Sequence, residues 1–115
     1  YGNGKYFEAY RMMNEMDNNK QMPSISVVTP VFNSENTLDE FCRRLTKSLI
    51  VYSFDYEIIF VNDSSVDNSS NIIHHLAEND SNVIYIDLNK NFGQHNALLC
   101  GIHQAKYEFI IDELM

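Results

Sequence analysis

The chain has 115 residues, of which 44% are hydrophobic, and a formal net charge of −8. That length fits one globular domain, and an acidic surface repels nucleic acid phosphates, so a nucleic acid is not an expected partner. No apolar run approaches the ~20 residues that a membrane-spanning helix needs.

Residues 1–22 are polar, rich in Asn and Met, and without strand pattern. Aromatic and Met side chains recur there at helical spacing, so we expect an N-terminal arm or a short helix. Pro23 is a plausible boundary, and residues 23–115 form the globular part.

From Pro23 onward, segments with strand and helix patterns alternate. Apolar β-forming runs predict strands at 25–31, 57–61, 83–88 and 109–111, and helical patterns cover 37–52, the stretch after Asp67, and 93–105. We predict a capping box between Thr37 and Glu40 and an N-cap at Asp67. The fold class is therefore α/β, a Rossmann-like parallel sheet of about four strands with three crossover helices. A chain ending just after a strand leaves an open sheet edge, so we expect a domain truncated at its C-terminus.

The cysteines and histidines give no sign of a metal site. Cys42 and Cys100 lie far apart without Cys-x-x-Cys spacing, which indicates reduced core thiols of an intracellular protein. The histidines lack metal spacing and a partnering Asp or Cys, so we interpret them as solvent-facing helix residues: His74, His75, His95 and His103.

Polar or aromatic residues follow all four predicted strands, and the carboxyl ends of parallel strands meet at one edge, where open α/β sheets bind ligands. The residues delivered there are Pro30, Phe32, Glu35, Asp63, Lys90, Gly93, Asp112 and Glu113. A carboxylate can accept the imide N–H of uracil, an aromatic ring can stack on a base, and a lysine can pair with a phosphate. Acidic groups after the fourth strand can hold Mg²⁺ or Mn²⁺ against a diphosphate.

Each of these residues also has a simple structural interpretation. Asp63 can form a turn, Phe32 can belong to the core, Gly93 can permit a tight turn and Lys90 can be solvated. Their convergence on one edge favours a nucleotide site.

Three segments resemble the family 2 glycosyltransferases, which have the GT-A fold. Pro30–Glu35 is similar to a Pro-Val-Tyr-Asn-Glu-like segment, and Val61–Asp67 to a Val-Asp-Asp-Gly-Ser-x-Asp segment. Leu88–Leu98 resembles the Ser-Arg-Asn-Phe-Gly-Gln-x-x-Ala-Leu segment of the polyprenyl-phosphate branch, which includes dolichyl-phosphate mannose synthases and undecaprenyl-phosphate sugar transferases. The resemblance spans residues 24–112 and corresponds to the N-terminal half of a GT-A fold.

The resemblance implies an inverting transfer of a sugar from a UDP- or GDP-sugar to a lipid phosphate or another glycan acceptor, as in cell envelope glycan biosynthesis. It implies a divalent metal, and a cytoplasmic location, peripheral to the inner face of a membrane in the parent protein. It places a uridine or guanosine pocket at Pro30, Phe32, Glu35, Asp63 and Lys90, with Gly93 beside it. It identifies no catalytic residue in this chain.

The chain departs from the family pattern at several positions. Asn62 replaces the first Asp, Ser64 replaces Gly, and Lys90 replaces Arg. Counted without a gap, the family's Asp-x-Asp metal motif falls at Leu114 and beyond the last residue, which leaves Asp112 as the candidate metal ligand.

Three functions remain open at this point. The first is a donor-binding part of a glycosyltransferase, which we expect to bind its donor weakly and to transfer little or no sugar alone. The second is a non-catalytic interaction module that forms homo-oligomers through an open sheet edge. The third is a phospho-receiver domain, since Asp63 and Asp112 end two strands, although the Asn91–Gln94 segment argues against it.

Overall fold

The computed structural model describes residues 22–115, so the predicted N-terminal arm or helix lies outside the described residues. The elements are β1 (Ile25–Val31), α2 (Leu38–Tyr52), β2 (Tyr56–Asn62), α3 (Ser69–Asn79), β3 (Val83–Asp87), α4 (Gln94–Gln104) and β4 (Phe109–Asp112). The strands are ordered β3-β2-β1-β4, and every neighbouring pair is parallel. This arrangement confirms the predicted α/β fold.

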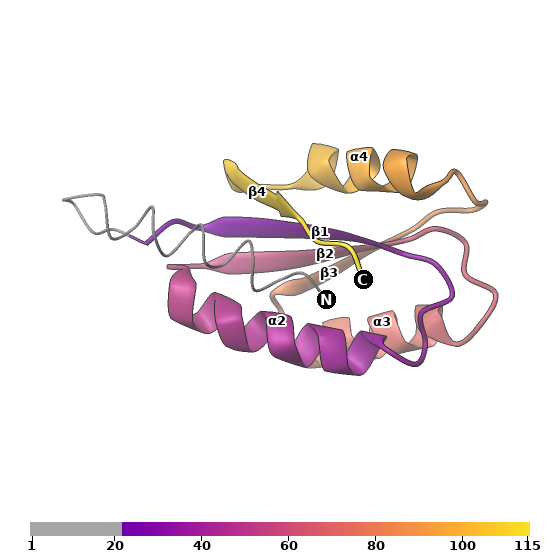
Figure 1. Ribbon diagram of the computed structural model, residues 1–115, viewed down its shortest axis with the longest axis horizontal. Coiled ribbons are helices and arrows are strands. Elements are labelled where there is room, and N and C mark those ends of the chain that lie inside the picture. Colours follow the sequence, from indigo (N-terminus) through magenta and orange to yellow (C-terminus); the bar gives the residue numbers. More distant parts are fainter. Residues whose placement is uncertain (1–21) are drawn as a thin grey trace.

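The sheet lies between two helical layers. α4 covers one face, and α2 and α3 cover the other (Figure 1). Alternate residues of β1 therefore enter two different cores: Val27 and Val31 pack on the α2 and α3 side, and Val28 packs on the α4 side. Burial on both faces explains why the central strands are mostly apolar along their whole length. The arrangement leaves the carboxyl ends of the strands, and the loops that follow them, together at one edge.

α4 approaches the sheet closely at Gly101. A Cβ atom there would lie 2.2 Å from Val28 Cγ1 and 2.8 Å from Val61 Cγ2. Both valines are fully buried, so neither can move aside freely.

The substitution Gly101→Ala is expected to lower the free energy of unfolding by about 1–2 kcal/mol, because overpacking outweighs the ~1 kcal/mol gain in helix propensity. Urea unfolding followed by circular dichroism measures the change. His103→Ala, at an exposed position of the same helix, is the control and should change stability little. A Gly101→Ala protein as stable as wild type would contradict the close contact.

A buried polar network ties the connection between α4 and β4 to the two central strands. Ser26 Oγ donates to Glu57 Oε2 at 2.6 Å, and Glu57 is only 2% exposed. The backbone N–H of Lys106 donates to the same Glu57 oxygen at 2.7 Å, and that of Tyr107 donates to Ser26 Oγ at 3.1 Å. Because the buried polar groups are paired, the network fixes the entry to β4 without leaving an unmet hydrogen bond.

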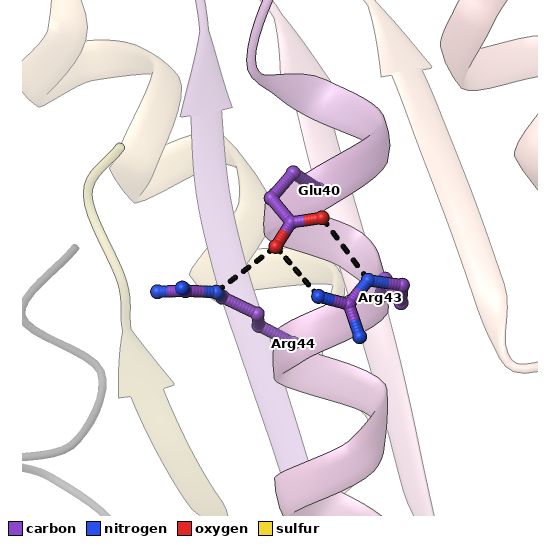
Figure 2. A network of polar contacts seen from close by, with 3 residues as sticks. All are labelled: Glu40, Arg43 and Arg44. Atoms are coloured by element: carbon purple, nitrogen blue, oxygen red, sulfur yellow. Dashed lines mark hydrogen bonds and ion pairs between the residues drawn. The ribbon is translucent and has the colours of Figure 1, made fainter.

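The capping box predicted at the start of α2 is wrong. Thr37 is the N-cap residue, but its side chain makes no capping hydrogen bond, and its Oγ1 donates to the Ser34 carbonyl instead. The Glu40 carboxylate pairs with Arg43 and Arg44 one turn further along the helix (Figure 2). Two arginines within reach compete successfully with a backbone N–H for this carboxylate.

The two cysteines are free thiols, as predicted. Cys42 is buried and Cys100 is half-buried. Burial raises the pKa of the Cys42 thiol above its usual value, which keeps it protonated at neutral pH. Cys42 is therefore a core residue of α2.

Candidate functional site

A cavity of about 300 Å³ opens at the carboxyl edge of the sheet. That volume lies at the small end of the range for ligand pockets. Of the residues predicted for a nucleotide site, Pro30, Phe32, Asp63 and Gly93 line it, whereas Glu35 and Lys90 are not among the lining residues. Six further lining residues were not among the predicted site residues: Val31, Ser34, Asn91, Gln94, Leu114 and Met115.

Asp63 follows β2 directly and joins two loops at the cavity. Only 3% of it is exposed, and its Oδ1 accepts the backbone N–H of Phe92 at 2.8 Å. Its Oδ2 accepts the backbone N–H of Gly93 at 3.0 Å. A carboxylate oxygen can accept more than one hydrogen bond, so Asp63 can hold the loop between β3 and α4 and still accept from a ligand. Its structural and binding roles are compatible.

Gly93 closes that loop and precedes α4. Its φ is +92°, in the region that favours glycine, and no heavy atom lies within 4 Å of where a Cβ would stand. Its N–H also contacts Asn91 Oδ1 at 2.9 Å. Since Gly93 and Gln94 both line the cavity, the N-terminal end of α4 lies there, and helix N-termini favour anions such as phosphate.

An aromatic ring and a cation lie on opposite loops of the site. Phe32 is 48% exposed although it lines the cavity, so its ring is accessible to a ligand. Lys90 Nζ lies 5.1 Å from the centroid of the Phe92 ring, which is a cation–π distance. Lys90 thus stands next to the lining residue Asn91 without being part of the lining itself.

The loop after β1 and the loop after β2 are joined by reciprocal hydrogen bonds. Asn33 N–H donates to Ser65 Oγ at 3.0 Å, and Val66 N–H donates to Asn33 Oδ1 at 2.9 Å. Both loops contain a left-handed residue, Asn33 with φ 50° and Ser64 with φ 60°. Ser64 stands where the resembling family segment has Gly, and its positive φ gives the physical reason for glycine at that position.

Glu35 and Asp67 extend this junction away from the cavity. Glu35 N–H donates to Asp67 Oδ2 at 3.1 Å, and Glu35 Oε2 accepts the N–H of Asn68 at 3.2 Å. The predicted N-cap was one residue early, since Asn68 is the N-cap of α3. Asp67 nevertheless accepts the Ser69 N–H of the first turn at 2.9 Å. Both carboxylates therefore hold the loops that shape the site.

Asn62, at the end of β2, belongs to a network that reaches the edge of the sheet. Its Nδ2 donates to Asp87 Oδ1 at 3.1 Å, and its Oδ1 accepts the Ser65 N–H at 3.2 Å. His74 Nε2 lies 2.7 Å from Asp87 Oδ2, and the His74 ring lies 4.2 Å from that of Tyr85. The interpretation of the histidines as lacking an Asp partner is therefore wrong for His74, because its partner comes from a strand.

The two acidic residues at the end of β4 point to opposite faces of the sheet. Asp112 pairs in register with Val28 on the α4 face, and it is not among the residues that line the cavity, whereas Leu114 and Met115 are. Glu113 N–H donates to the Val28 carbonyl at 2.9 Å, so the alternation continues and puts Glu113 beside the opposite core. Within residues 22–115, no three His, Cys, Asp or Glu side chains converge as metal ligands. The structure therefore does not place Asp112, the predicted metal ligand, in the cavity or in a cluster of ligands.

Glu113 is 1% exposed, and neither of its carboxylate oxygens has a hydrogen-bond partner. Burial, assisted by the Asp112 charge, raises the pKa of Glu113 to about 7. The hydroxyl of Thr29, the residue after Val28 in β1, is also buried without a partner. Burying these polar groups without hydrogen-bond partners lowers the stability of the folded protein at this end of the sheet.

Residues 26–111 match the sequence model of the family described as Glycosyl transferase family 2. The chain belongs to this family. Among curated family members, it is 40% identical over 88 residues to an undecaprenyl-phosphate 4-deoxy-4-formamido-L-arabinose transferase of Pseudomonas fluorescens, covering 76% of this chain and 26% of the relative. A Shewanella sediminis protein of the same name is 39% identical over 97 residues, covering 84% of this chain and 29% of the relative. The chain thus spans little more than a quarter of these relatives.

Solved glycosyltransferase structures share the fold. S. aureus TarS residues 1–349 in complex with UDP superposes with a TM-score of 0.67 at 26% identity, over 79% of this chain and 27% of that one. The mannosyltransferase PcManGT from Pyrobaculum calidifontis, in complex with GDP-Man and Mn²⁺, gives a TM-score of 0.71 at 17% identity, over 91% and 32%. The predicted GT-A type of fold is confirmed.

Proposed function

We propose that this chain forms the donor-binding part of a sugar transferase, and that its cavity takes the nucleoside of a UDP- or GDP-sugar. The observation that carries the proposal is the meeting of Asp63, Phe32 and Gly93 at one cavity on the carboxyl edge of the sheet. The carboxylate would accept an N–H of the base, the ring would stack on it, and the N-terminus of α4 would face phosphate.

A polyprenyl phosphate is the acceptor that the family relatives support, since their names specify undecaprenyl phosphate. An acceptor phosphate is already ionised near neutral pH, so direct displacement at the sugar C1 needs no strong general base. Within residues 22–115, no helix is long and apolar enough to cross a bilayer. We assign transfer to the whole protein, at the cytoplasmic face of a membrane, and only weak donor binding to this chain.

The described residues could hold a divalent ion only together with a bound ligand, because they offer no cluster of three metal-binding side chains. Mg²⁺ in nucleotide sites is commonly held by one or two carboxylates together with substrate phosphates and water. Asp112, which ends β4 outside the cavity lining, would supply one carboxylate, and the diphosphate would supply further oxygens. When bound, the ion would neutralise diphosphate charge beside an acidic protein.

The ring of Phe32 allows a direct test of donor binding. Phe32→Ala is expected to weaken binding of UDP or GDP in the presence of Mn²⁺ about tenfold, because stacking of a base on an aromatic ring contributes roughly 1–3 kcal/mol. Isothermal titration calorimetry on the full chain measures the affinity. The matched control is Phe54→Ala, which removes the same ring from an exposed position far from the cavity.

Two outcomes would overturn the proposal: no heat from wild type with either nucleotide, or equal affinity of the Phe32→Ala and Phe54→Ala proteins. Light scattering on the same samples addresses the alternative of an interaction module. A stable oligomer that binds neither nucleotide would favour that alternative, whereas a nucleotide-binding monomer would dispose of it.

A further inference from the structure

Asn33 lies between two residues that line the cavity, but it does not line the cavity itself. Phe32 and Ser34 are lining residues, whereas the side chain of Asn33 contacts the loop after β2, where its Oδ1 accepts the Val66 N–H at 2.9 Å. The φ of Asn33 is 50°, in the left-handed region that Asn adopts more readily than most residues other than glycine. Asn33 therefore holds the neighbouring loop, while the residues on either side of it belong to the cavity wall.

The loop after β1 is fastened to the loop after β2 through consecutive backbone groups. Both loops lie at the carboxyl end of the sheet (Figure 1). The N–H groups of residues 33, 34 and 35 donate, in that order, to Ser65 Oγ at 3.0 Å, Ser69 Oγ at 2.8 Å and Asp67 Oδ2 at 3.1 Å. N–H groups of the second loop donate back to Asn33 Oδ1 and Glu35 Oε2. We call this set of hydrogen bonds the loop clasp.

The clasp is anchored to the sheet through Ser65. The Ser65 N–H donates to Asn62 Oδ1 at 3.2 Å, and Asn62, the last residue of β2, is only 4% exposed. Asn62 Nδ2 donates in turn to Asp87 Oδ1 at 3.1 Å, at the end of β3. Because this support comes from the ends of two strands, the second loop is a firm attachment for the loop that contains Asn33.

The position of the Phe32 ring depends on this attachment. Phe32 is 48% exposed, so the core does not enclose its ring as it encloses Phe41 or Phe60. The Phe32 carbonyl accepts the Ser34 hydroxyl at 3.1 Å, and the next residue in the chain is Asn33. The backbone that the clasp holds therefore determines where the ring lies.

We propose that Asn33 is a positioning residue of the donor site, which holds the Phe32 ring where a nucleoside base can stack on it. The inference rests on the proposed function and deepens it, because it names a residue that governs base binding without touching the ligand. A loop released at Asn33 would spend part of its time with the ring away from the cavity. The apparent affinity falls in proportion to the population of the binding-competent arrangement.

A double-mutant cycle on the full chain tests the proposal. Asn33→Gly removes the acceptor of the Val66 N–H and keeps a residue that favours a positive φ. We expect it to weaken binding of UDP or GDP in the presence of Mg²⁺ about fivefold, the change in population that the loss of one ordinary hydrogen bond produces. In a Phe32→Ala background the same substitution should change the affinity by less than about twofold, because no ring is left to position. Chemical-shift titration by NMR measures these affinities even when binding is weak.

Asn36→Gly is the matched control, because it makes the same change three residues later, at an exposed position of the same loop that lies outside the clasp. It should leave the affinity within about twofold of wild type. Urea unfolding of every variant separates positioning from stability. The shift in the urea midpoint that Asn33→Gly causes should be the same with and without the Phe32 ring, whereas its effect on affinity should require the ring.

Three results would overturn the inference and leave donor binding intact: equal affinity of Asn33→Gly and wild type, an equal loss in Asn36→Gly, or the same loss in the Phe32→Ala background. A wild-type chain that binds neither nucleotide would overturn the proposed function and the inference together. Weaker binding by Asn33→Gly only where Phe32 is present would support both.

Discussion

Replacing Asp63 by Ala is expected to lower the free energy of unfolding by about 2–3 kcal/mol and to reduce nucleotide affinity by at least tenfold. The carboxylate is almost fully buried and accepts backbone N–H groups of Phe92 and Gly93. Without it, the Phe92 N–H loses its acceptor, whereas the Gly93 N–H keeps Asn91 Oδ1. The loop between β3 and α4 would then open, and the cavity would lose the wall that both residues form.

Chemical unfolding and calorimetric titration together measure the two effects of this substitution. Asp39→Ala is the matched control, because it removes an exposed carboxylate at the start of α2 and should cost at most about 0.5 kcal/mol. Asp63→Asn adds information: it keeps the side-chain volume but replaces one acceptor oxygen by a donor that faces an N–H. Wild-type stability in Asp63→Ala would show that the two hydrogen bonds do not hold the loop.

Glu113→Gln is expected to stabilise the protein at pH 8 by roughly 2 kcal/mol, allowing for partial screening by water at the end of the sheet. The wild-type side chain is buried without a partner, and its pKa rises from 4.5 to about 7 on folding. A neutral amide of the same shape avoids burying a charge, although its own polar atoms still lack partners.

The pH dependence separates this effect from a simple packing change. Because the folded state holds the Glu113 proton more tightly than the unfolded state, the wild-type stability is highest, for this group, below pH 4.5. It falls as pH rises from 4.5 through about 7 and is level above that. The difference between Glu113→Gln and wild type should therefore appear in that window.

Urea unfolding at a series of pH values, in buffer with EDTA, measures the difference. Glu108→Gln, five residues earlier near the start of β4, serves as the control. A Glu113→Gln protein that is less stable than wild type at pH 8, or a difference that does not change with pH, would contradict the raised pKa.

The bounds of the strands were predictable from sequence to within one residue, for a physical reason. Central strands of a parallel sheet are buried on both faces, so β1 and β2 are mostly apolar on both faces, which is not the pattern of an amphipathic helix. The carboxyl edge followed from topology alone, since parallel strands must end together. Hence Asp63, Phe32 and Gly93 could be placed at one cavity before their side-chain contacts were known.

Contacts between distant segments could not be predicted in this way. His74 and Asp87 show no motif spacing, and they meet only because α3 packs beside β3. The prediction of a capping box was wrong because Arg43 and Arg44 bind the Glu40 carboxylate. The capping-box pattern considers only the residues at its own two positions and takes no account of such competing ion pairs. The faces of the sheet on which Asp112 and Glu113 lie depend on the register of β4 against β1. Two adjacent acidic residues in the sequence do not show that register.

The buried network around Glu57 has a consequence for how this domain can evolve. It lies at the connection that enters β4, whereas the cavity lies beyond the opposite, carboxyl ends of the same strands. The sheet thus separates residues that secure the chain from residues that contact a small molecule. Substitutions in the loops after β1, β2 and β3 can reshape the proposed donor cavity while the Glu57 network keeps the scaffold in place. Such separation lets one architecture diversify its substrates without renewed selection for folding.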